Sequence, residues 1–198
     1  MVMRDQMHEF RLHGRGGQGI VVAASIFAEA VFLNGRYARA FSLFGAERRG
    51  APVTAFIRAG QDSLMPRSRI YQPNFVAVFD PTLGGETLLS GLKEGGTLLV
   101  NIEKDCLDNL PEGALEGERF MVYTVDATAI ARKHGLTVAG FPVVNTVMLG
   151  AMAKVSGLTS VDNLIISIRK RISASIEANI NAVKEGAETV KEVGGLVK

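Results

Sequence analysis

The sequence predicts a single α/β domain over residues 1–198: a three-layer α/β/α sandwich with a mostly parallel sheet and a helical C-terminal part from about residue 160. Two observations lead to this fold class. Short, β-rich apolar runs alternate along the chain with longer helix-forming stretches, which is typical of βαβ units and a parallel sheet. Apolar residues make up 47% of the chain, which is enough to build a sizeable core.

Six strands are predicted from the spacing of apolar residues. The first alternates apolar and polar residues through Phe10 and Leu12, as a half-buried strand does. Three later runs are continuously apolar, which is typical of strands that are buried on both faces of a parallel sheet. The predicted ranges are 8–13, 37–42, 53–58, 75–79, 97–100 and 120–125, with a turn at 60–62 that leads into a hairpin or a crossover.

Four helical stretches are predicted between and after these strands. Their ranges are 20–34, 126–133, 143–155 and 161 to about 193. The first is rich in Ala, Val, Ile and Phe, so it should be buried on most faces. Asp126 and Asn145 are predicted to cap helices, and Asp80 to cap the turn after its strand. The last stretch carries an apolar stripe that should dock on the domain or on a partner: Ile165, Ile168, Ile172 and Ile176.

Charge and cysteine content exclude several functions. The 22 Lys and Arg against 20 Asp and Glu leave a net charge of +2, so nothing argues for nucleic acid or a membrane surface. The single cysteine, Cys106, excludes an intrachain disulfide and any zinc or iron–sulfur site built from several thiolates of this chain. The histidines lack metal-ligand spacing, no signal peptide is visible, and the longest apolar stretch is too short to span a bilayer. We expect a cytoplasmic protein that holds no metal by itself.

A glycine-rich loop follows the first strand directly. Gly14, Gly16 and Gly19 match the dinucleotide-binding pattern in form and in place, between a strand and a helix. The acidic residue that normally holds the ribose about 20 residues later is absent, although Arg39 would suit a 2′-phosphate. Two interpretations remain: a tight turn that permits close packing, or contact with an anion or cofactor. Gln18 adds an amide that can donate and accept towards a partner or ligand.

A second loop carries a charged run. Glu47, Arg48 and Arg49 precede Gly50, in a segment that is either a solvated turn or an ordered loop at a subunit contact or near an anion. We favour the ordered loop. If both loops lie at the carboxyl edge of the sheet, Arg15 should join this charged group.

Five segments of the chain are similar to one known family. They are Gly-Arg-Gly-Gly-Gln-Gly at 14–19, Phe-Gly-Ala-Glu-Arg-Arg-Gly-Ala-Pro-Val at 44–53, Phe-Asp-Pro at 79–81, Gly-Phe-Pro-Val-Val-Asn-Thr-Val-Met-Leu-Gly-Ala at 140–151, and the C-terminal helix with Asn179, Ala182 and Gly186. In this order, over nearly the whole chain, they resemble the gamma subunit of pyruvate and related 2-oxoacid:ferredoxin oxidoreductases. The pairing of the first two segments is far more specific than the glycine pattern alone.

The resemblance implies a complex that oxidatively decarboxylates a 2-oxoacid, passes the acyl group to coenzyme A and reduces ferredoxin. The expected partners are alpha, beta and ferredoxin-like delta subunits, and in this family thiamine diphosphate, magnesium and iron–sulfur clusters lie largely on those parts. The present sequence has neither a Gly-Asp-Gly segment with a downstream Asn-Asn nor a CxxCxxC motif. The chain should therefore be mainly structural, bind no cofactor alone and carry no catalytic residue.

The resemblance also implies that this chain lends loops to the rim of a composite site, where they contact a cofactor or a neighbouring subunit. The residues expected there are Gly14, Arg15, Gly16, Gly17, Gln18, Gly19, Glu47, Arg48, Arg49 and Gly50. One variant has the glycine loop and Arg48 or Arg49 touching coenzyme A. The alternative is a stand-alone nucleotide-binding protein for NADP, FAD or coenzyme A. As an assembly subunit, the isolated chain should expose an apolar surface. This surface could pair with itself in a homodimer, and whether it does so stays open. The 2-oxoacid itself stays open.

Overall fold

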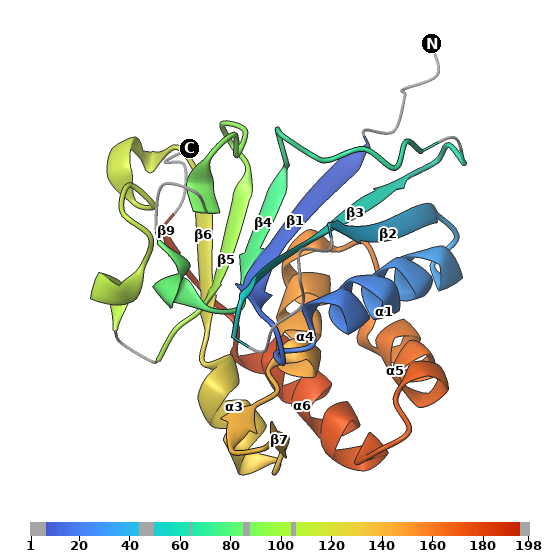
Figure 1. The fold of residues 1–198 in the computed structure, drawn as a ribbon. Coiled ribbons are helices and arrows are strands. Elements are labelled where there is room, and N and C mark those ends of the chain that lie inside the picture. Colours follow the sequence, from blue (N-terminus) through green and yellow to red (C-terminus); the bar gives the residue numbers. More distant parts are fainter. Residues whose placement is uncertain (1–6, 44–49, 64, 85–87, 104–105, 195–198) are drawn as a thin grey trace.

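A seven-stranded sheet forms the centre of the protein (Figure 1). The computed structural model describes residues 7–43, 50–63, 65–84, 88–103 and 106–194. The strands of the sheet are β1 (His8–Arg15), β2 (Tyr37–Leu43), β3 (Pro52–Gly60), β4 (Phe75–Val78), β5 (Thr97–Asn101), β6 (Met121–Val125) and β9 (Lys191–Gly194). Their order across the sheet is β2-β3-β1-β4-β5-β6-β9.

The middle of the sheet is parallel and its two sides are antiparallel. β1, β4, β5 and β6 run in one direction. β3 is antiparallel to both β1 and β2, and β9 is antiparallel to β6, so β2 runs with the central strands while β3 and β9 oppose them. The prediction of a mostly parallel sheet is confirmed. The six predicted strands match β1 to β6 to within about two residues at each end.

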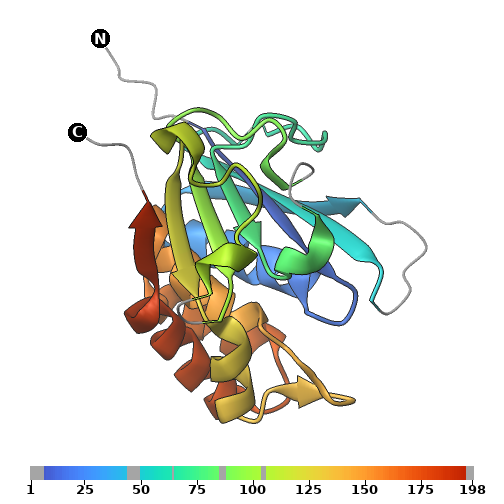
Figure 2. The same cartoon turned by 90° about the vertical axis from the view of Figure 1, so that its left-hand side faces the viewer.

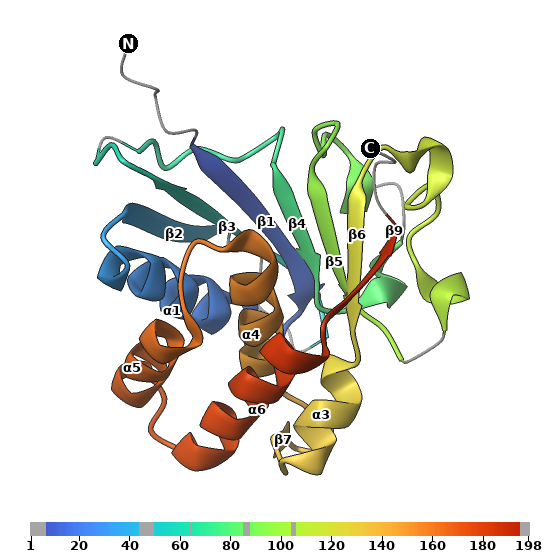
Figure 3. The ribbon, with the colours of Figure 1, turned by 180° about the vertical axis from the view of Figure 1, so that it is seen from behind.

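The helices cover one face of the sheet (Figures 1 and 3). They are α1 (Ile20–Leu33), α3 (Ala127–Lys133), α4 (Asn145–Ser156), α5 (Val161–Arg171) and α6 (Ile176–Thr189). Alternate residues of β1, Phe10 and Leu12, join them in one buried core. Asp126 caps α3 as predicted, since its Oδ1 accepts a hydrogen bond from Ala129 N at 2.8 Å.

The opposite face is covered by shorter elements. Val76, Val78 and Leu98 pack there in a second apolar cluster beneath turns and irregular segments. The regular pieces of this layer include the 3₁₀ turns η1 (Pro81–Leu83), η2 (Leu107–Asn109) and η3 (Glu116–Glu118), and Leu88 and Leu89 are helical. The predicted sandwich therefore has one thick helical layer and one thin layer.

Arginines from three adjacent strands hold irregular segments onto this second face. Arg11 Nη2, on β1, donates to the carbonyl oxygens of Leu88 at 3.0 Å and Ser90 at 2.6 Å. Arg39 on β2 and Arg58 on β3 hold the connection between β3 and β4 in the same way. Carbonyl groups outside helices and sheets need such donors when they are removed from water. In a helix these carbonyl groups would accept from the backbone. Here the arginine side chains of the strands donate to them instead.

Two glycines let α4 and α6 pack at close range. A Cβ atom at Gly150 would overlap the carbonyl oxygen of Val183, and one at Gly186 would overlap the carbonyl oxygen of Val147. Gly186 lies inside α6, where glycine normally weakens a helix. Its place in the predicted helical segment is explained by this contact between two helix backbones.

The C-terminal region corrects the prediction of one helical pattern from residue 161 to about residue 193. The chain forms two helices separated at residues 172–175, where Ser175 adopts a left-handed conformation with φ of 51°. The break turns α6 back along α4, and Ile172 and Ile176 still pack against the core. The last residues of the pattern form β9 instead, because Thr124 and Tyr123 of β6 offer a sheet edge for pairing. A strand of four residues is too short for its alternating pattern to be recognised in the sequence.

A two-stranded hairpin, β7 (Thr137–Val138) and β8 (Phe141–Pro142), was not predicted either. It projects from the helices at the lower right of Figure 2. Its turn contains Ala139 at φ 48° and Gly140 at φ 83°, a pair of left-handed residues of the kind that two-residue hairpin turns require. Nothing but Gly140 signals this turn in the sequence, since alanine rarely adopts a positive φ.

None of the helices in the described part of the chain combines the length and apolar character that a membrane span needs.

Candidate functional site

The glycine-rich loop lies where the sheet changes its winding. β1 leads through the loop into α1 on the helical face, whereas β4 leads into η1 and segments of the opposite face (Figure 1). The two strand ends are adjacent, since Phe79 N donates to the carbonyl oxygen of His13 at 2.7 Å. Crevices at the carboxyl ends of strands, at such a switch point, are where open α/β sheets bind ligands. The predicted loop therefore occupies the favoured position for a site.

A cluster of four polar side chains closes the loop at this point. Gln18 Oε1 accepts from Arg15 N at 2.7 Å, and Gln18 Nε2 donates to Asp80 Oδ2 at 3.1 Å. Arg15 Nε donates to the same oxygen at 3.1 Å, and Arg15 Nη2 donates to Thr82 Oγ1 at 2.9 Å. The other oxygen of Asp80 accepts from Thr82 N at 3.0 Å and from Thr82 Oγ1 at 2.6 Å. We call Arg15, Gln18, Asp80 and Thr82 the switch-point cluster.

Asp80 and Thr82 were not predicted as partners of the glycine-rich loop. The sequence indicated Asp80 only as a cap, and that role is confirmed by its bond to Thr82 N. The available signal was its position, directly after a buried parallel strand. Strand order was needed to bring it beside Arg15, because β1 and β4 are neighbours only in space.

The second loop meets the first through its last residues. Gly50 N donates to the carbonyl oxygen of Gly16 at 3.0 Å, and Gly16 N donates to the carbonyl oxygen of Ala51 at 2.8 Å. Arg15 Nη1 also donates to the carbonyl oxygen of Gly50 at 3.2 Å. The charged residues Glu47, Arg48 and Arg49 lie outside the described residues. The end of their loop is nevertheless fixed beside Arg15, at the edge where the sequence analysis expected the two loops to meet.

Close packing fixes the helix end of the loop. Gly19 has φ of 77° and precedes α1, and a Cβ atom there would lie 2.6 Å from Asn145 Nδ2. Asn145 is the first residue of α4, and its Oδ1 accepts from Thr146 N at 2.8 Å. The predicted capping role of Asn145 is wrong, because Val144 occupies the cap position and no side chain caps this helix. The third glycine of the pattern is therefore needed for contact between the loop and α4. This contact supports the interpretation of a tight, closely packed turn.

The cluster leaves little of the loop for a diphosphate. The amides of Arg15, Gly16 and Gln18 already donate to acceptors within the protein, at Gln18 Oε1, Ala51 O and Arg15 O. The carboxylate of Asp80 adds a negative charge where a phosphate would need free donors. About a third of the Arg15 side chain is exposed (33%), against 16% of the Asp80 side chain. The exposed guanidinium edge suits contact with a neighbouring protein or a single anionic group.

His13 lies at the end of β1 but is turned away from solvent. It is 7% exposed, and its Nε2 atom has no hydrogen-bond partner. Burial, and then the positive charges of Arg11 and Arg69, lower the pKa of His13 to about 3. The imidazole is therefore neutral at physiological pH. This agrees with the sequence interpretation of a strand-end residue and gives no support to a general base.

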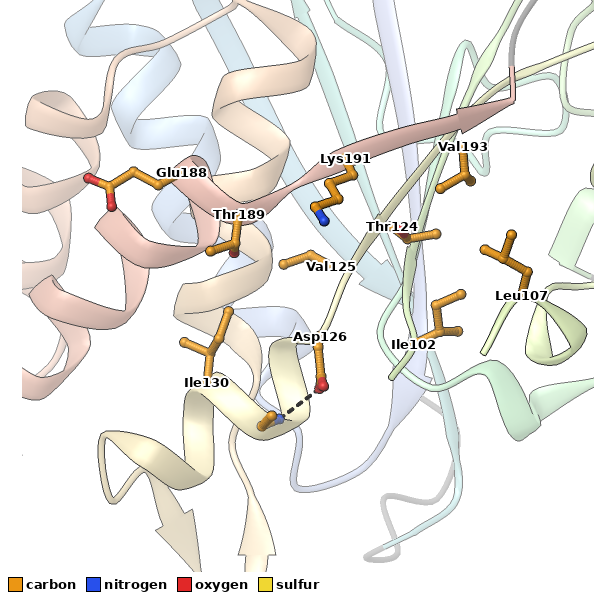
Figure 4. A pocket seen from close by; sticks show the side chains of 11 residues that line it. Ile102, Leu107, Thr124, Val125, Asp126, Ile130, Glu188, Thr189, Lys191 and Val193 are labelled. Carbon is orange, nitrogen blue, oxygen red and sulfur yellow. Dashed lines mark hydrogen bonds between the residues drawn. The ribbon is translucent and has the colours of Figure 1, made fainter. Parts of the chain in front are cut away.

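A separate pocket of about 590 Å³ opens where β6 and α3 diverge from α6 and β9 (Figure 4). Its lining is mainly apolar and includes Ile102, Leu107, Thr124, Val125, Asp126, Ala129, Ile130, Glu188, Thr189, Lys191 and Val193. This pocket was not predicted from the sequence, because one of its walls is the unpredicted strand β9. The carboxylate of Asp126 caps α3 here, as the dashed line in Figure 4 shows.

The single cysteine of this chain does not fit an iron–sulfur cluster, and the described residues form no metal site. Cys106 is its single cysteine, whereas a cluster needs several thiolates. Within the described ranges, no three residues among His, Cys, Asp and Glu gather closely enough to hold a metal.

Comparison with known proteins identifies the class. A family model described as pyruvate ferredoxin/flavodoxin oxidoreductase matches residues 9–189. The chain therefore belongs to this family, and its relatives place it among the gamma-type subunits. Pyruvate synthase subunit PorC of Methanothermobacter marburgensis is 43% identical over 190 residues, which cover 95% of this chain and 100% of that protein. The common subunit gamma of the pyruvate/ketoisovalerate oxidoreductases of Thermococcus litoralis is 43% identical over 184 residues, covering 92% and 96%.

A solved structure shares the fold. Pyruvate oxidoreductase subunit PORC from Thermotoga maritima superposes with a TM-score of 0.77 at 36% identity, covering 94% of this chain and 98% of that chain. The family resemblance predicted from the sequence is confirmed. The alternative of a stand-alone nucleotide-binding protein finds no support, either in these relatives or in the occupied amides of the loop.

Proposed function

We propose that this gamma subunit acts as an assembly subunit in a complex that oxidatively decarboxylates a 2-oxoacid, with coenzyme A as acyl acceptor and ferredoxin as electron acceptor. It contributes no catalytic residue. Its glycine-rich loop and the loop that ends at Gly50 line the rim of a site whose chemical groups come from other subunits. The observation that carries this proposal is the switch-point cluster, whose polar groups are satisfied by one another.

The cofactors follow from this division. Thiamine diphosphate would carry the carbanion chemistry, magnesium would bind its diphosphate, and iron–sulfur clusters would carry electrons. We assign all of them to the alpha, beta and ferredoxin-like delta subunits, since one cysteine cannot supply a cluster. A cytoplasmic location fits a chain with a single, unpaired cysteine.

Anaerobic co-purification tests the proposal. A tagged chain is isolated from its native cells, and reduction of a viologen dye is assayed with and without a 2-oxoacid and coenzyme A. The relatives named above act on pyruvate or ketoisovalerate, so these two are the first substrates to supply. Partners that bring thiamine and clusters, with turnover that requires both substrates, support the proposal. A chain that comes alone and binds NADP, FAD or coenzyme A tightly contradicts it.

A narrower part of the proposal concerns coenzyme A. The partly exposed guanidinium of Arg15, with the donors left beside its internal bonds, would bind one of its phosphates at the rim of the site together with Arg48 or Arg49. In the purified complex, Arg15→Ala should then raise the KM for coenzyme A by about tenfold while the KM for the 2-oxoacid stays constant. Arg132→Ala, at an exposed position on α3, is the matched control. Unchanged dependence on coenzyme A in the alanine variants at 15, 48 and 49 would remove this contact.

A further inference from the structure

The connection between β3 and β4 crosses the amino end of the sheet, opposite to the glycine-rich loop (Figure 1). Residues 65–72 form its central part, and we call them the arginine–tyrosine loop. Their place is set by β1 and β3, since His8 pairs with Ala59 at the same end of the sheet. The backbone of the loop thus lies at the opposite end of the sheet from the switch-point cluster, which lies at the carboxyl ends of β1 and β4.

A buried arginine, Arg58, and a partly buried one, Arg39, hold the backbone of this loop. Arg39 Nη1 donates to the carbonyl oxygen of Met65 at 2.6 Å. Arg58 Nη1 donates to the carbonyl oxygens of Pro66 at 2.7 Å and Ser68 at 2.8 Å. Arg58 is 5% exposed and is itself held by Glu9, with Nε and Oε1 2.9 Å apart. The loop is therefore preorganised, although it contains no regular helix or strand.

Apolar anchors add to these bonds. Met65 and Ile70 are both buried, at the start and near the end of the loop. The residues between and after them point outward: Arg67 and Arg69 are exposed, and Tyr71 is 70% exposed. The guanidinium carbon of Arg69 lies 5.5 Å from the centre of the Tyr71 ring, so the two side chains form one surface.

This surface is positively charged. Residues 65–72 contain two arginines and no Asp or Glu. Over the described part of the chain, neither Arg67 nor Arg69 forms an ion pair, and the nearby Glu9 already binds Arg58 and Lys93. The charge of Arg69 also acts on the buried His13. Burial and Arg11 are the larger causes of the lowered pKa of His13, and Arg69 adds to them.

We propose that the arginine–tyrosine loop is a docking surface for a carboxylate-rich patch on another protein subunit of the same complex. Arg67 and Arg69 bind carboxylates of the partner, and Tyr71 packs against the partner beside Arg69. Arginine and tyrosine are the residues that most often dominate protein interfaces, and a rigid loop loses little conformational entropy on binding. This inference rests on the proposed function, because it requires a complex.

A second copy of the chain is the less favourable occupant. A two-fold contact centred on this loop would bring Arg67 and Arg69 of both copies together without a carboxylate between them. Like charges at an interface cost binding energy. An acidic partner relieves the same charges instead.

Charge reversal tests the proposal in the native complex. The tagged chain is expressed in its native cells as wild type, as the double variant Arg67→Glu/Arg69→Glu, and as Tyr71→Ala. The control, Lys154→Glu/Lys184→Glu, makes the same change in net charge at exposed positions on α4 and α6. Each chain is purified anaerobically and washed with rising NaCl, and every co-purifying subunit is quantified against the tagged chain by mass spectrometry.

The double variant should retain about tenfold less of one partner subunit, and release it at lower salt than wild type does. Tyr71→Ala should lose the same subunit to a smaller extent, and the lysine control should behave like wild type. Circular dichroism melting of each isolated chain checks that all variants fold, since the altered side chains are exposed.

Equal retention and equal salt dependence of all partners in the arginine variant would overturn the proposal. The same loss in the lysine control would also overturn it, because net charge alone would then explain the effect. Loss of self-association with intact partner binding would assign the loop to a second copy. A wild-type chain without any partner would refute the proposed function itself, and with it the subunit named here.

Discussion

Arg15 and Asp80 lie 65 residues apart in the chain, yet the Nε atom of Arg15 is 3.1 Å from Oδ2 of Asp80. They meet because β1 and β4 are neighbouring parallel strands whose carboxyl ends lie side by side. Gln18 donates to the same oxygen, so one carboxylate joins the glycine-rich loop to the end of β4. The proposed rim of the composite site depends on this single side chain.

Asp80→Ala should therefore destabilise the protein. It removes the acceptor of Arg15, Gln18 and Thr82 at once, and a partly buried network of this kind contributes about 1–3 kcal/mol to the free energy of unfolding. Urea denaturation monitored by circular dichroism measures the change. Asp108→Ala, at an exposed position in η2, is the control and should change stability by less than about 0.5 kcal/mol. Equal effects of the two variants would show that the cluster contributes nothing.

At neutral pH, Gln18→Glu should destabilise the protein more than Gln18→Ala does. The new carboxylate would replace an amide whose Nε2 atom lies 3.1 Å from Oδ2 of Asp80, so two like charges would meet. Such a neighbour raises the pKa of a carboxyl group, and the resulting loss of stability appears as pH rises through the raised pKa. The urea midpoints of the two variants should thus differ at about pH 7.5 and converge near pH 4. A gap that does not change with pH would exclude charge repulsion as the cause.

His13 should make the protein sensitive to acid. Its pKa is lowered from 6.5 to about 3 in the folded protein, by burial first and then by Arg11 and Arg69. The unfolded chain therefore takes up a proton at a higher pH than the folded chain does. Stability from this group is complete above the unfolded pKa and is lost as pH falls from about 6.5 towards about 3.

Replacement of His13 should remove this sensitivity. When the pH falls from 7.5 to 5, titration of His13 should lower the free energy of unfolding of the wild type by about 2 kcal/mol. The His13→Phe variant should not show this loss. The free energies of unfolding of both chains, measured at the two pH values, give the difference. An identical loss in both would mean that the imidazole is protonated in the folded protein.

Gly186→Ala should destabilise α6 although alanine is the better helix former. The added Cβ would overlap the carbonyl oxygen of Val147, so α4 and α6 would have to move apart. We expect Gly186→Ala to lower the free energy of unfolding by about 1–3 kcal/mol. Asn181→Ala, at an exposed position of the same helix, should raise it by up to about 0.7 kcal/mol. Thermal melting distinguishes the two signs. A stabilising Gly186→Ala would mean that the two backbones do not touch.

Local pattern was sufficient to predict most elements of the fold. The six predicted strands and the helix capped by Asp126 agree with the structure, because their side-chain periods reflect burial on one or both faces. The glycine-rich loop was also recognisable, since tight strand-to-helix turns demand glycine. The family followed from five segments in a fixed order, of which the first two are the most specific. The charged residues Glu47, Arg48 and Arg49 remain a prediction, as they lie outside the described residues.

Long-range pairing decided the rest. β9 exists because β6 offers it an edge, and the same strand then forms one wall of the pocket beside Asp126. Asp80 belongs to the candidate site because strand order places β4 next to β1. Arg39 and Arg58 anchor the arginine–tyrosine loop through backbone carbonyls, which every sequence supplies equally. Periodicity records how each segment is buried, but it holds no information on which distant segment does the burying.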